Sequence, residues 1–360
     1  MPVSRRILLL VTDLEIGGTP TVVRELATRL AADASAHVHA ACLGRFGPVA
    51  RQIAEAHLPV SAFDGHSWRQ FPSILRRLLN LIDREGIDTI FSFLVHANAV
   101  AATAALARPR VRLLISIQGA LPRPRWHWGL HRLIHHAAQT VVVPTKSAAA
   151  AAMRWSGIPR HKLAVVPNAV DPASFSGISP PAPDQRPCPI GFLGRLDPVK
   201  RLGDLIQATA LLKGRVHLHV FGEGVDRAAA EAQIAALGVG NLVTLHGAVD
   251  HPRRALERVA VLVLPSEAEG FGLVLIEAMA AGVPVVATDA PGIRDVVVHG
   301  ESGLLVPVRS PPRLAAAIES LIEDRALRQR LTARGVAQVR ERFSWEPVMA
   351  QYRRLLHIRG

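Results

Sequence analysis

The chain has 360 residues, a formal net charge of +13, 49% hydrophobic residues and only 4% aromatic ones. This length is sufficient for two domains with separate cores, and the apolar content excludes an intrinsically disordered chain. No stretch approaches the roughly 18 consecutive apolar residues that a membrane-spanning helix needs. The composition therefore predicts a soluble α/β protein rich in alanine, valine and leucine.

The positive charge is concentrated in the first half of the chain. Residues 1–170 carry 20 Lys and Arg against 9 Asp and Glu, whereas the remainder carries 22 against 20. A basic half favours an anionic partner, such as nucleic acid, an anionic membrane surface or a phosphorylated acceptor. The excess equally fits a GC-rich genome's preference for arginine, and both explanations stay open.

The cysteines and the first residues indicate a cytoplasmic protein. Cys42 and Cys188 match no metal-binding spacing, which suggests a reducing compartment and buried packing for both. The apolar run 7–11 is followed by Asp13 and Glu15 and is too short for the core of a signal peptide. We interpret it as the first buried strand.

The first half alternates short apolar runs with helical patterns, which predicts a parallel sheet covered by helices on both faces. Strands are predicted at residues 7–12, 37–43, 59–63, 88–94, 111–117, 140–144 and 163–167. Helices are predicted at residues 19–33, 48–57, 72–85, 97–107, 126–138 and 146–156.

The second half repeats this alternation after a segment rich in proline, serine and glycine. Strands are predicted at 190–193, 242–245, 261–264 and 285–288, and helices from about 198, at 273–281, in a long stretch 312–342 and at 346–357, with Ser344 as a candidate N-cap. The predicted fold is α/β, with two doubly wound Rossmann-like domains facing each other across a cleft. The predicted division is a first domain 1–170, a linker 171–189, a second domain 190–342, and a C-terminal helical segment 343–360 that could return to the first domain.

The most specific motif lies in residues 260–309. An apolar strand leads into Glu269 and the turn Gly270-Phe271-Gly272, and a helix beginning at Leu273 carries Glu277. A helix start with small residues leaves backbone N–H groups free for phosphate, and carboxylates accept hydrogen bonds from hydroxyl groups. The motif therefore favours a diphosphate that carries sugars. Each element alone is also common in ordinary turns.

Two basic residues follow the strand 190–193. Arg195 lies in the turn, and Lys200 lies near the start of the predicted helix. Cations at a helix N-terminus are disfavoured by the helix dipole, so two of them indicate an anion nearby. Solvated surface charge is the alternative for either residue. Gly222 also follows a strand, on the same predicted edge of the sheet.

Two features of the first domain follow predicted strands. Gly17 and Gly18 come after the first strand and allow close approach of a ligand, although they do not form the six-residue dinucleotide motif. His96 follows the strand that ends near residue 94. A histidine beside an apolar segment is often a core residue, whereas its place at a carboxyl strand end favours a site.

Residues 122–136, PRPRWHWGLHRLIHH, alternate basic and aromatic residues with apolar ones at partly helical spacing. This composition is typical of an interfacial helix held by anionic lipid headgroups. It fits a solvated basic helix beside a core tryptophan equally well, and the sequence leaves both open.

Taken together, these motifs resemble the retaining nucleotide-sugar glycosyltransferases of family 4, which share the GT-B fold. The resemblance covers nearly the whole chain and is most specific in EGFGLVLIE, which joins Glu269 to Glu277. Departures from the family pattern are Thr19-Pro20 after the glycines, Arg201 where glycine often follows the lysine, and Asp295 where Glu is frequent.

The resemblance implies roles for the motif residues. Arg195 and Lys200 correspond to a clamp on the donor diphosphate, Glu277 to the ribose ligand, and Glu269 and His96 to residues near the reacting sugar. The amides around residues 270–273 correspond to the phosphate cradle and Val249 to the position beside the nucleobase, with Gly17, Gly18 and Gly222 completing the predicted binding residues.

The expected activity is therefore retaining transfer of a hexosyl group from a UDP-sugar or GDP-sugar to a saccharide or lipid-linked saccharide of a cell-envelope glycan. No cofactor and no metal are expected, because cationic groups and amides replace the metal and no Asp-x-Asp pair occurs. The expected location is the cytoplasm or the inner membrane face. A sugar-nucleotide epimerase of the same fold and a basic nucleic-acid-binding protein are the alternatives; the former lacks the EGFGLVLIE loop, and no nucleic acid is expected because the latter leaves the two glutamates unexplained.

Overall fold

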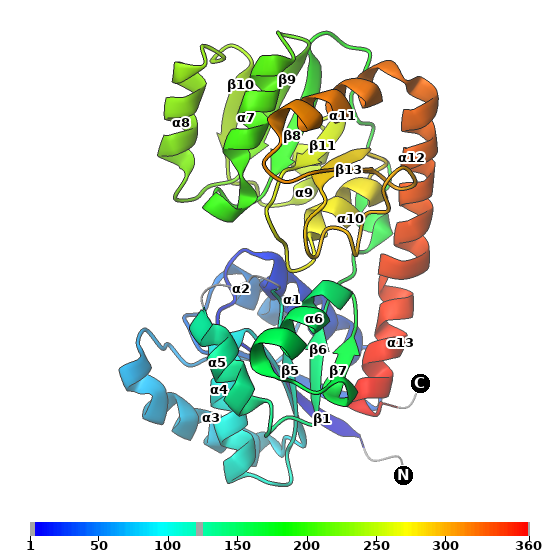
Figure 1. Ribbon diagram of the computed structural model, residues 1–360. Helices are drawn as coiled ribbons and strands as arrows, with labels where there is room; N and C mark the ends of the chain where they lie inside the picture. Colours follow the sequence, from blue (N-terminus) through cyan, green and yellow to red (C-terminus); the bar gives the residue numbers. More distant parts are fainter. Residues whose placement is uncertain (1–3, 120–124, 359–360) are drawn as a thin grey trace. The chain divides into compact units, whose positions relative to one another are not determined.

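The computed structural model describes residues 4–119 and 125–358, which form two compact units. The first unit comprises the chain up to Asn168 together with the residues from Val348 onward, and the second comprises Ala169–Pro347. Figure 1 shows a parallel sheet with helices in each unit. The predicted α/β class with two doubly wound domains is confirmed.

The first unit contains a parallel sheet of order β3-β2-β1-β4-β5-β6-β7. Chain order therefore reverses between β1 and β4, which pair directly through registers such as Val11 with Phe93. Its strands are β1 Arg5–Val11, β2 Ala36–Cys42, β3 Val60–Ala62, β4 Thr89–Phe93, β5 Arg112–Ser116, β6 Thr140–Val143 and β7 Leu163–Val165. All seven strands that the sequence predicts here are present.

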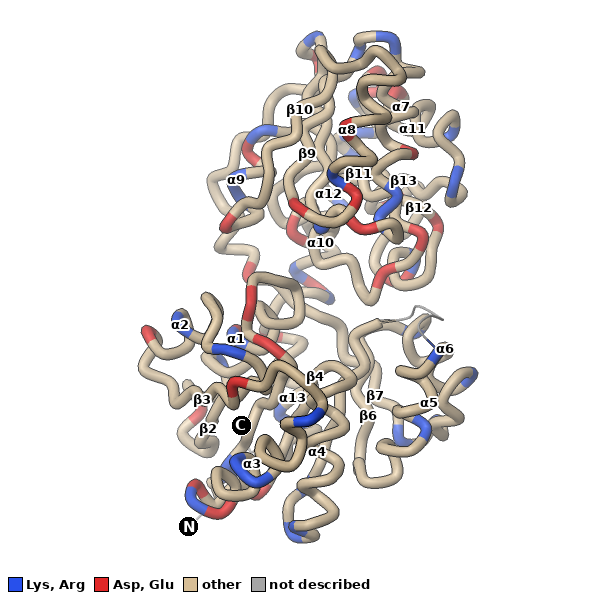
Figure 2. The backbone as a smooth tube through the Cα atoms, turned by 90° about the vertical axis from the view of Figure 1, so that its left-hand side faces the viewer, with Lys and Arg blue, Asp and Glu red and all other residues tan. Residues whose placement is uncertain are grey.

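Helices cover this sheet, and the charged residues are distributed unevenly over them. The helices are α1 Gly18–Ala31, α2 Pro48–Glu55, α3 Phe71–Glu85, α4 Val95–Ala107, α5 Arg125–Ile134 and α6 Lys146–Ser156, with short 3-10 turns at Trp68–Gln70 and Arg160–Lys162. In Figure 2 the tube around α5 and α6 carries basic residues and no acidic ones. The last helix, α13 Trp345–Leu356, packs Tyr352 near Phe91 and pairs Arg353 with Asp33.

The second unit contains a parallel sheet of order β10-β9-β8-β11-β12-β13. The strands are β8 Cys188–Leu193, β9 Val216–Phe221, β10 Val243–Gly247, β11 Val261–Leu264, β12 Val285–Thr288 and β13 Leu304–Val306. The helices are α7 Leu202–Leu211, α8 Arg227–Ala236, α9 Pro252–Leu256, α10 Leu273–Ala280, α11 Pro311–Glu323 and α12 Arg325–Gln338. Chain order reverses between β8 and β11.

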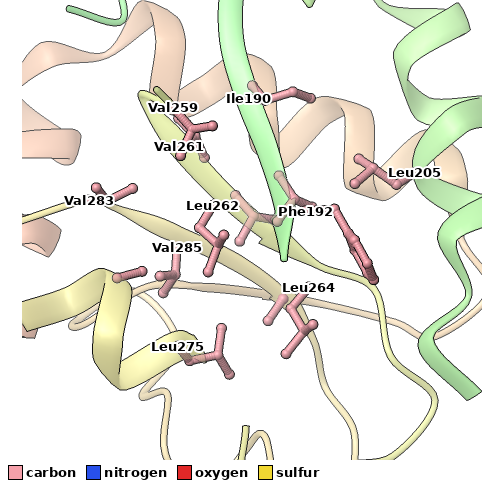
Figure 3. Packing of buried hydrophobic residues seen from close by; sticks show 14 of the residues in the cluster. Ile190, Phe192, Leu205, Val259, Val261, Leu262, Leu264, Leu275, Val283 and Val285 are labelled. Carbon is pink, nitrogen blue, oxygen red and sulfur yellow. The ribbon is translucent and has the colours of Figure 1, made fainter. Parts of the chain in front are cut away.

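The core of the second unit forms around these two central strands. Ile190 and Phe192 of β8 lie beside the apolar residues of β11, with Leu275 of α10 below them (Figure 3). Gly191 permits this packing, because a Cβ atom added there would lie 2.6 Å from the side chain of Val259. The close packing of β8 fixes the direction in which its following loop leaves the sheet.

The structure corrects two helix boundaries. The helix predicted from about Pro198 begins at Leu202, because residues 198–200 form a 3-10 turn and Arg201 adopts the left-handed conformation with φ 52°. The stretch 312–342 is not one helix: Asp324 leaves the helical conformation and caps α12 by accepting from the backbone N–H of Leu327. A π-helical turn, Val339–Phe343, then follows.

The left-handed conformation explains why glycine is frequent at the position of Arg201. A side chain with φ near +50° is strained, and glycine is not. In this chain the guanidinium group donates two hydrogen bonds of 2.7 Å to Asp204, one from Nε and one from Nη2. This bidentate pair stabilises the turn that carries Lys200.

Three smaller expectations have clear outcomes. Cys42 and Cys188 are both buried, as predicted, and burial raises the pKa of the Cys188 thiol to about 11. Ser344 lies directly before α13, at the position predicted for an N-cap, and its hydroxyl group donates to the carbonyl of Arg340 at 2.8 Å. Among the described residues, no helix is both long enough and apolar enough to cross a lipid bilayer.

Candidate active site

The predicted motifs of the second unit meet where the chain order of its sheet reverses. The loop after β8 carries Arg195 and Lys200, and the loop after β11 carries Glu269. Because β8 and β11 are neighbours, their carboxyl ends place both loops at one point of the sheet edge. Ligands of doubly wound sheets bind at this point of reversal.

Glycines hold the loops after β8 and β9 against each other. A Cβ atom on Gly222 would lie 1.9 Å from the carbonyl oxygen of Gly194, and one on Gly224 would lie 2.4 Å from that of Leu196. The backbone N–H of Leu196 donates to the carbonyl of Glu223 at 2.9 Å. Gly222, predicted as a binding residue, therefore has a packing role that requires glycine.

Lys200 and Glu269 form an ion pair at the reversal point. The Lys200 Nζ atom lies 2.6 Å from Glu269 Oε1, and the two side chains are only 18% and 10% exposed. Desolvated charges of this kind are retained where they are paired and hydrogen-bonded. The structure thus brings together two residues that lie 69 positions apart in the sequence and that were predicted to bind the same donor.

Ser266 is a site residue that the sequence analysis missed. Its hydroxyl group is fully buried and donates to Glu269 Oε1 at 2.6 Å, and its backbone carbonyl accepts a hydrogen bond from the hydroxyl of Thr288. The available signal was the spacing Ser-x-x-Glu directly after a strand, in which the serine can reach the glutamate locally. Ser266 fixes one carboxylate oxygen of Glu269.

Replacing Ser266 with alanine is expected to weaken substrate turnover without unfolding the chain. The change removes one hydrogen bond to a charged group, which is typically worth about 1.5–3 kcal/mol and corresponds to a loss of roughly 10- to 100-fold in kcat/KM. Ser266→Thr retains the hydroxyl group and should recover part of the activity. Equal kcat/KM for Ser266→Ala and the native chain would show that Ser266 does not orient Glu269.

Arg195 is placed differently from Lys200. Its side chain is 78% exposed and pairs with Asp197, with 2.8 Å between Nη2 and Oδ2. Both predicted phosphate-binding cations therefore have a carboxylate of the protein as partner. A long exposed side chain changes partner at low cost, because exposed ion pairs contribute only about 0–1 kcal/mol.

Gly272, the N-cap residue directly before α10, adopts the left-handed conformation, and no side chain caps the helix. The phenyl ring of Phe271 is buried and lies edge-on to Phe343 with 5.5 Å between ring centroids. The side chain of Phe271 thus anchors the turn in the core. The first amides of α10, at Leu273 and Val274, retain the positive end of the helix dipole for an anion.

Gly292 brings a further loop against the backbone of Glu269. Its φ is +84°, and an added Cβ atom would lie 2.1 Å from the carbonyl oxygen of Glu269. The backbone N–H of Glu269 also donates to the carbonyl of Pro291 at 3.0 Å. The loop after β12 therefore fixes the main chain that positions Glu269.

Glu277 lies on α10 and is half-buried. Among the described residues no group forms a hydrogen bond or an ion pair with its carboxylate. Burial raises the pKa of Glu277 to about 7. A carboxylate held in this way gains most from a ligand that donates hydrogen bonds to its ionised form. Val249, predicted beside the nucleobase, follows β10 and packs half-buried against the core of the same unit.

In the first unit the predicted residues follow the neighbouring strands β1 and β4. Gly17 precedes α1 with an extended backbone, and α1 begins at Gly18. His96 is exposed at the start of α4, so a core role for this histidine is excluded. Leu94, just before α4, has φ 71° without being glycine, a strained conformation that often marks functional sites.

Aromatic rings surround His96. The ring centroid of Trp126 lies 5.6 Å from that of His96, and the ring of His127 lies 6.4 Å away. Burial, with a smaller contribution from His96, holds the pKa of His127 below its usual range. Residues 122–124 of the basic segment lie outside the described residues, and the rest of the segment forms the whole of α5 and the two residues after it.

The two parallel-sheet units define the class of protein to which the chain belongs. The chain has the GT-B architecture of nucleotide-sugar glycosyltransferases. The crystal structure of Anabaena Alr3699/HepE in complex with UDP and glucose matches with a TM-score of 0.88 and 21% identity, covering 98% of this chain and 99% of that chain. Sucrose-phosphate synthase from Thermosynechococcus elongatus matches with a TM-score of 0.82 and 22% identity, covering 98% of both chains.

The family follows from the sequence comparisons. The family model "Glycosyltransferase Family 4" matches residues 16–174, and the model "Glycosyl transferases group 1" matches residues 181–338. Because these two matches together span both units, the chain belongs to the family of glycosyltransferases that the two models describe, one for each unit.

Curated relatives agree with the family over part of their length. The D-inositol 3-phosphate glycosyltransferase of Xylanimonas cellulosilytica is 30% identical over 262 residues, which is 67% of this chain and 62% of that protein. The lipopolysaccharide core biosynthesis glycosyltransferase LpsE of Rhizobium meliloti is 36% identical over 164 residues, which is 46% of this chain and 48% of that protein. The chain thus spans between about half and three fifths of these relatives.

Proposed function

We propose that this chain transfers a hexosyl group from a nucleoside diphosphate sugar to an acceptor hydroxyl group, with retention of anomeric configuration and without a metal ion. The observation that carries the proposal is the desolvated Lys200–Glu269 pair at the point where strand order reverses, next to the uncapped start of α10. Cation, carboxylate and free amides in one place fit a diphosphate joined to a sugar.

In the proposed reaction the bond between the sugar C1 atom and the β-phosphate oxygen breaks, a bond from C1 to the acceptor oxygen forms on the same face, and the acceptor's proton passes to the departing phosphate. Negative charge then develops on the phosphate, and the Lys200 ammonium group and the amides of Leu273 and Val274 stabilise it. Arg195 is free to swing from its exposed pair with Asp197 toward the same phosphate. These groups perform the charge stabilisation for which other glycosyltransferases use a metal ion, and the chain contains no Asp-x-Asp pair.

The two glutamates are proposed to bind hydroxyl groups of the donor. Glu269, oriented by Ser266, accepts from the transferred sugar, and Glu277 accepts from the nucleotide ribose. A uridine nucleotide is the donor we favour over a guanosine nucleotide, because the structural relative was crystallised with UDP, UDP and glucose, and UDP-glucose. Gly222 and Val249 border the proposed nucleoside position.

Donor binding is expected to weaken on acidification because of Glu277. Its pKa of about 7 in the free protein means that most molecules carry a neutral carboxyl group below that pH. If the ribose hydroxyls require the ionised form, the Kd of a UDP-sugar should rise about tenfold between about pH 8 and pH 6. Calorimetry with a UDP-sugar measures this without interference, because its phosphates are diesters and do not titrate near neutrality.

The isostere Glu277→Gln provides the control and a second readout. At pH 8 this variant should bind the UDP-sugar more weakly than the native chain, and its Kd should be nearly independent of pH. The folded-state pKa of about 7 lies above the ordinary value of 4.5, so ionisation of the native carboxylate destabilises the fold progressively between about pH 4.5 and pH 7, by about 1 kcal/mol or more above pH 7. Glu277→Gln should therefore raise Tm at pH 8 and raise it much less at pH 4. A pH-independent Kd in the native chain would exclude this role.

The acceptor is proposed to be a saccharide or a lipid-linked saccharide of a cell-envelope glycan, bound on the side of the first unit. Support comes from His96, exposed beside the strained Leu94, and from Gly17 and Gly18 at the end of the adjacent strand. The name of the lipopolysaccharide core relative also supports a saccharide acceptor of a cell-envelope glycan. The proposed location is the cytoplasm, with access to the inner membrane face.

Turnover of donors tests the proposal directly. The chain is incubated with UDP-, GDP- and ADP-sugars with water as the acceptor, and release of the nucleoside diphosphate is measured once with a chelator and once with added Mg²⁺. We expect release from one donor class, equal rates with and without chelator, and a first sugar product with the anomeric configuration of the donor by NMR. An inverted first product contradicts retention, and loss of turnover in chelator contradicts metal independence.

A further inference from the structure

We propose that the exposed faces of α5 and α6 dock on an anionic phospholipid surface. The residues concerned, which we call the α5–α6 face, are Arg125, Trp126, Arg132, Leu133, Met153, Arg154 and Trp155. The inference rests on the proposed function, because it identifies the surface that would present a lipid-linked acceptor to the first unit.

The charge of this part of the chain is one-sided. No Asp or Glu occurs between Asp88 and Asp171, whereas 10 Lys and Arg and 6 His occur there. Before this segment, Arg5, Arg24 and Arg29 each pair with a carboxylate. Figure 2 shows basic residues without acidic ones around α5 and α6. The positive potential here is therefore not neutralised within the segment itself.

The helix α5 presents one continuous outward stripe. Arg125, Trp126, Gly129, Arg132 and Leu133 are exposed, and their spacing of 1, 4, 7 and 8 residues places them on one side of a helix. Trp126 is 53% exposed and Leu133 is 71% exposed. The opposite side, with Trp128, His131 and Ile134, is buried.

The helix α6 extends this surface with the same chemistry. Met153 and Trp155 are 39% and 40% exposed, and Arg154 lies between them in the sequence. The guanidinium carbon of Arg154 lies 5.1 Å from the centroid of the Trp155 ring. Among the described residues neither Arg132 nor Arg154 pairs with a carboxylate. Each helix thus presents cations and large apolar side chains together.

Hydrogen bonds link α6 and the turn after it to α5 and the residues that follow α5. The buried hydroxyl group of Ser156, at the end of α6, donates to the carbonyl of Trp128 in α5 at 2.9 Å. Lys162 Nζ donates to the carbonyls of His135 and Ala138 at 3.0 Å each, just after α5. The exposed side chains are therefore presented in a fixed arrangement, which reduces the entropy lost on docking.

The aliphatic side chains distinguish a lipid surface from a nucleic acid. Arginine and tryptophan serve both, because bases stack on aromatic rings and phosphates attract cations. Leu133 and Met153 have no comparable partner in a phosphate groove, whereas at a bilayer they enter the boundary between headgroups and acyl chains. Trp126 also lies 5.6 Å from His96, so the face borders the residue proposed for the acceptor side.

Vesicle flotation of the full chain tests the docking. The native chain should float with vesicles of phosphatidylglycerol and phosphatidylcholine and lose this binding in phosphatidylcholine alone or in high salt. Arg125→Gln/Arg132→Gln/Arg154→Gln should reduce partitioning by about 100-fold, since each arginine near the surface contributes roughly fivefold. Leu133→Ser/Trp155→Ser should also lower it. Trp68→Ser/Arg69→Gln/Arg76→Gln, matched in kind and likewise exposed, should float like the native chain.

The outcomes separate docking from the proposed function. Calorimetry with UDP-sugars is run on the same proteins, and all variants should bind the donor like the native chain, because the donor residues lie in the second unit. Equal flotation of the face variants and the native chain overturns the docking proposal, as does binding to RNA or DNA with no binding to anionic vesicles. Normal flotation with no nucleotide binding overturns the proposed function and leaves the docking in place.

Discussion

Lys200→Ala is expected to lower kcat by roughly 100- to 1,000-fold at saturating donor. Removal of one group that stabilises developing transition-state charge in a desolvated site typically has an effect of this size. Lys200 is suited to that role because its side chain is only 18% exposed and its ammonium nitrogen lies 2.6 Å from Glu269 Oε1. Steady-state release of nucleoside diphosphate measures the effect.

Controls separate charge stabilisation from loss of structure. Lys213→Ala removes an exposed lysine from the turn just after α7 and should leave kcat unchanged. Since loss of Lys200 leaves the Glu269 carboxylate without its cation, Tm is measured for both variants, and Lys200→Ala/Glu269→Gln restores neutrality at that point. Lys200→Ala with a native Tm and a native kcat would show that Lys200 has no role in the chemical step.

Gly292→Ala is expected to disrupt the site indirectly, because it displaces the backbone of Glu269. A methyl group there would lie 2.1 Å from the Glu269 carbonyl oxygen, and neither atom belongs to a flexible side chain. The loop after β12 must therefore move away from Glu269. Overpacking of this kind costs about 1–3 kcal/mol in the free energy of unfolding, in addition to about 1–2 kcal/mol for an alanine in the left-handed conformation, and urea denaturation measures the sum. Donor affinity should fall in parallel.

Gly300→Ala is the matched control for backbone conformation. Gly300 has a φ of +74°, close to the +84° of Gly292, but nothing lies within 4 Å of its added Cβ atom. Gly300→Ala should show only the cost of the left-handed conformation, about 1–2 kcal/mol, with unchanged donor affinity. If both variants lose equal stability and bind donor equally well, contact of Gly292 with Glu269 does not position the site.

The order of strands and helices could be predicted from the sequence, because apolar periodicity and buried strands mark each element. The predicted strands 261–264 and 285–288 agree with β11 and β12 to the residue. The start of α7 could not be predicted, since Pro198 is favourable at a helix start and Arg201 carries no signal for a left-handed conformation. The break at Asp324 was visible only as a residue that favours N-caps.

The sequence could predict that residues of the candidate site follow neighbouring strands, but it could not predict their hydrogen-bond and ion-pair partners. Lys200 and Glu269 were both expected to bind the donor, but their ion pair depends on β8 and β11 being neighbours in the sheet. The pair of Arg195 with Asp197 is local, and the sequence alone did not favour it over a solvated side chain. The exposure of His96 could not be predicted from the sequence, because a histidine beside an apolar strand is equally compatible with a core and an exposed position.

Calorimetric titration of UDP, GDP and ADP into the full chain tests most directly whether the second unit binds a nucleoside diphosphate through Lys200, Glu277 and the start of α10. We predict one binding site, a preference for one base, a loss of affinity in Lys200→Ala and Glu277→Ala, and native affinity in Lys213→Ala. Absence of heat with all three nucleotides, or equal affinity in all variants, would contradict the account.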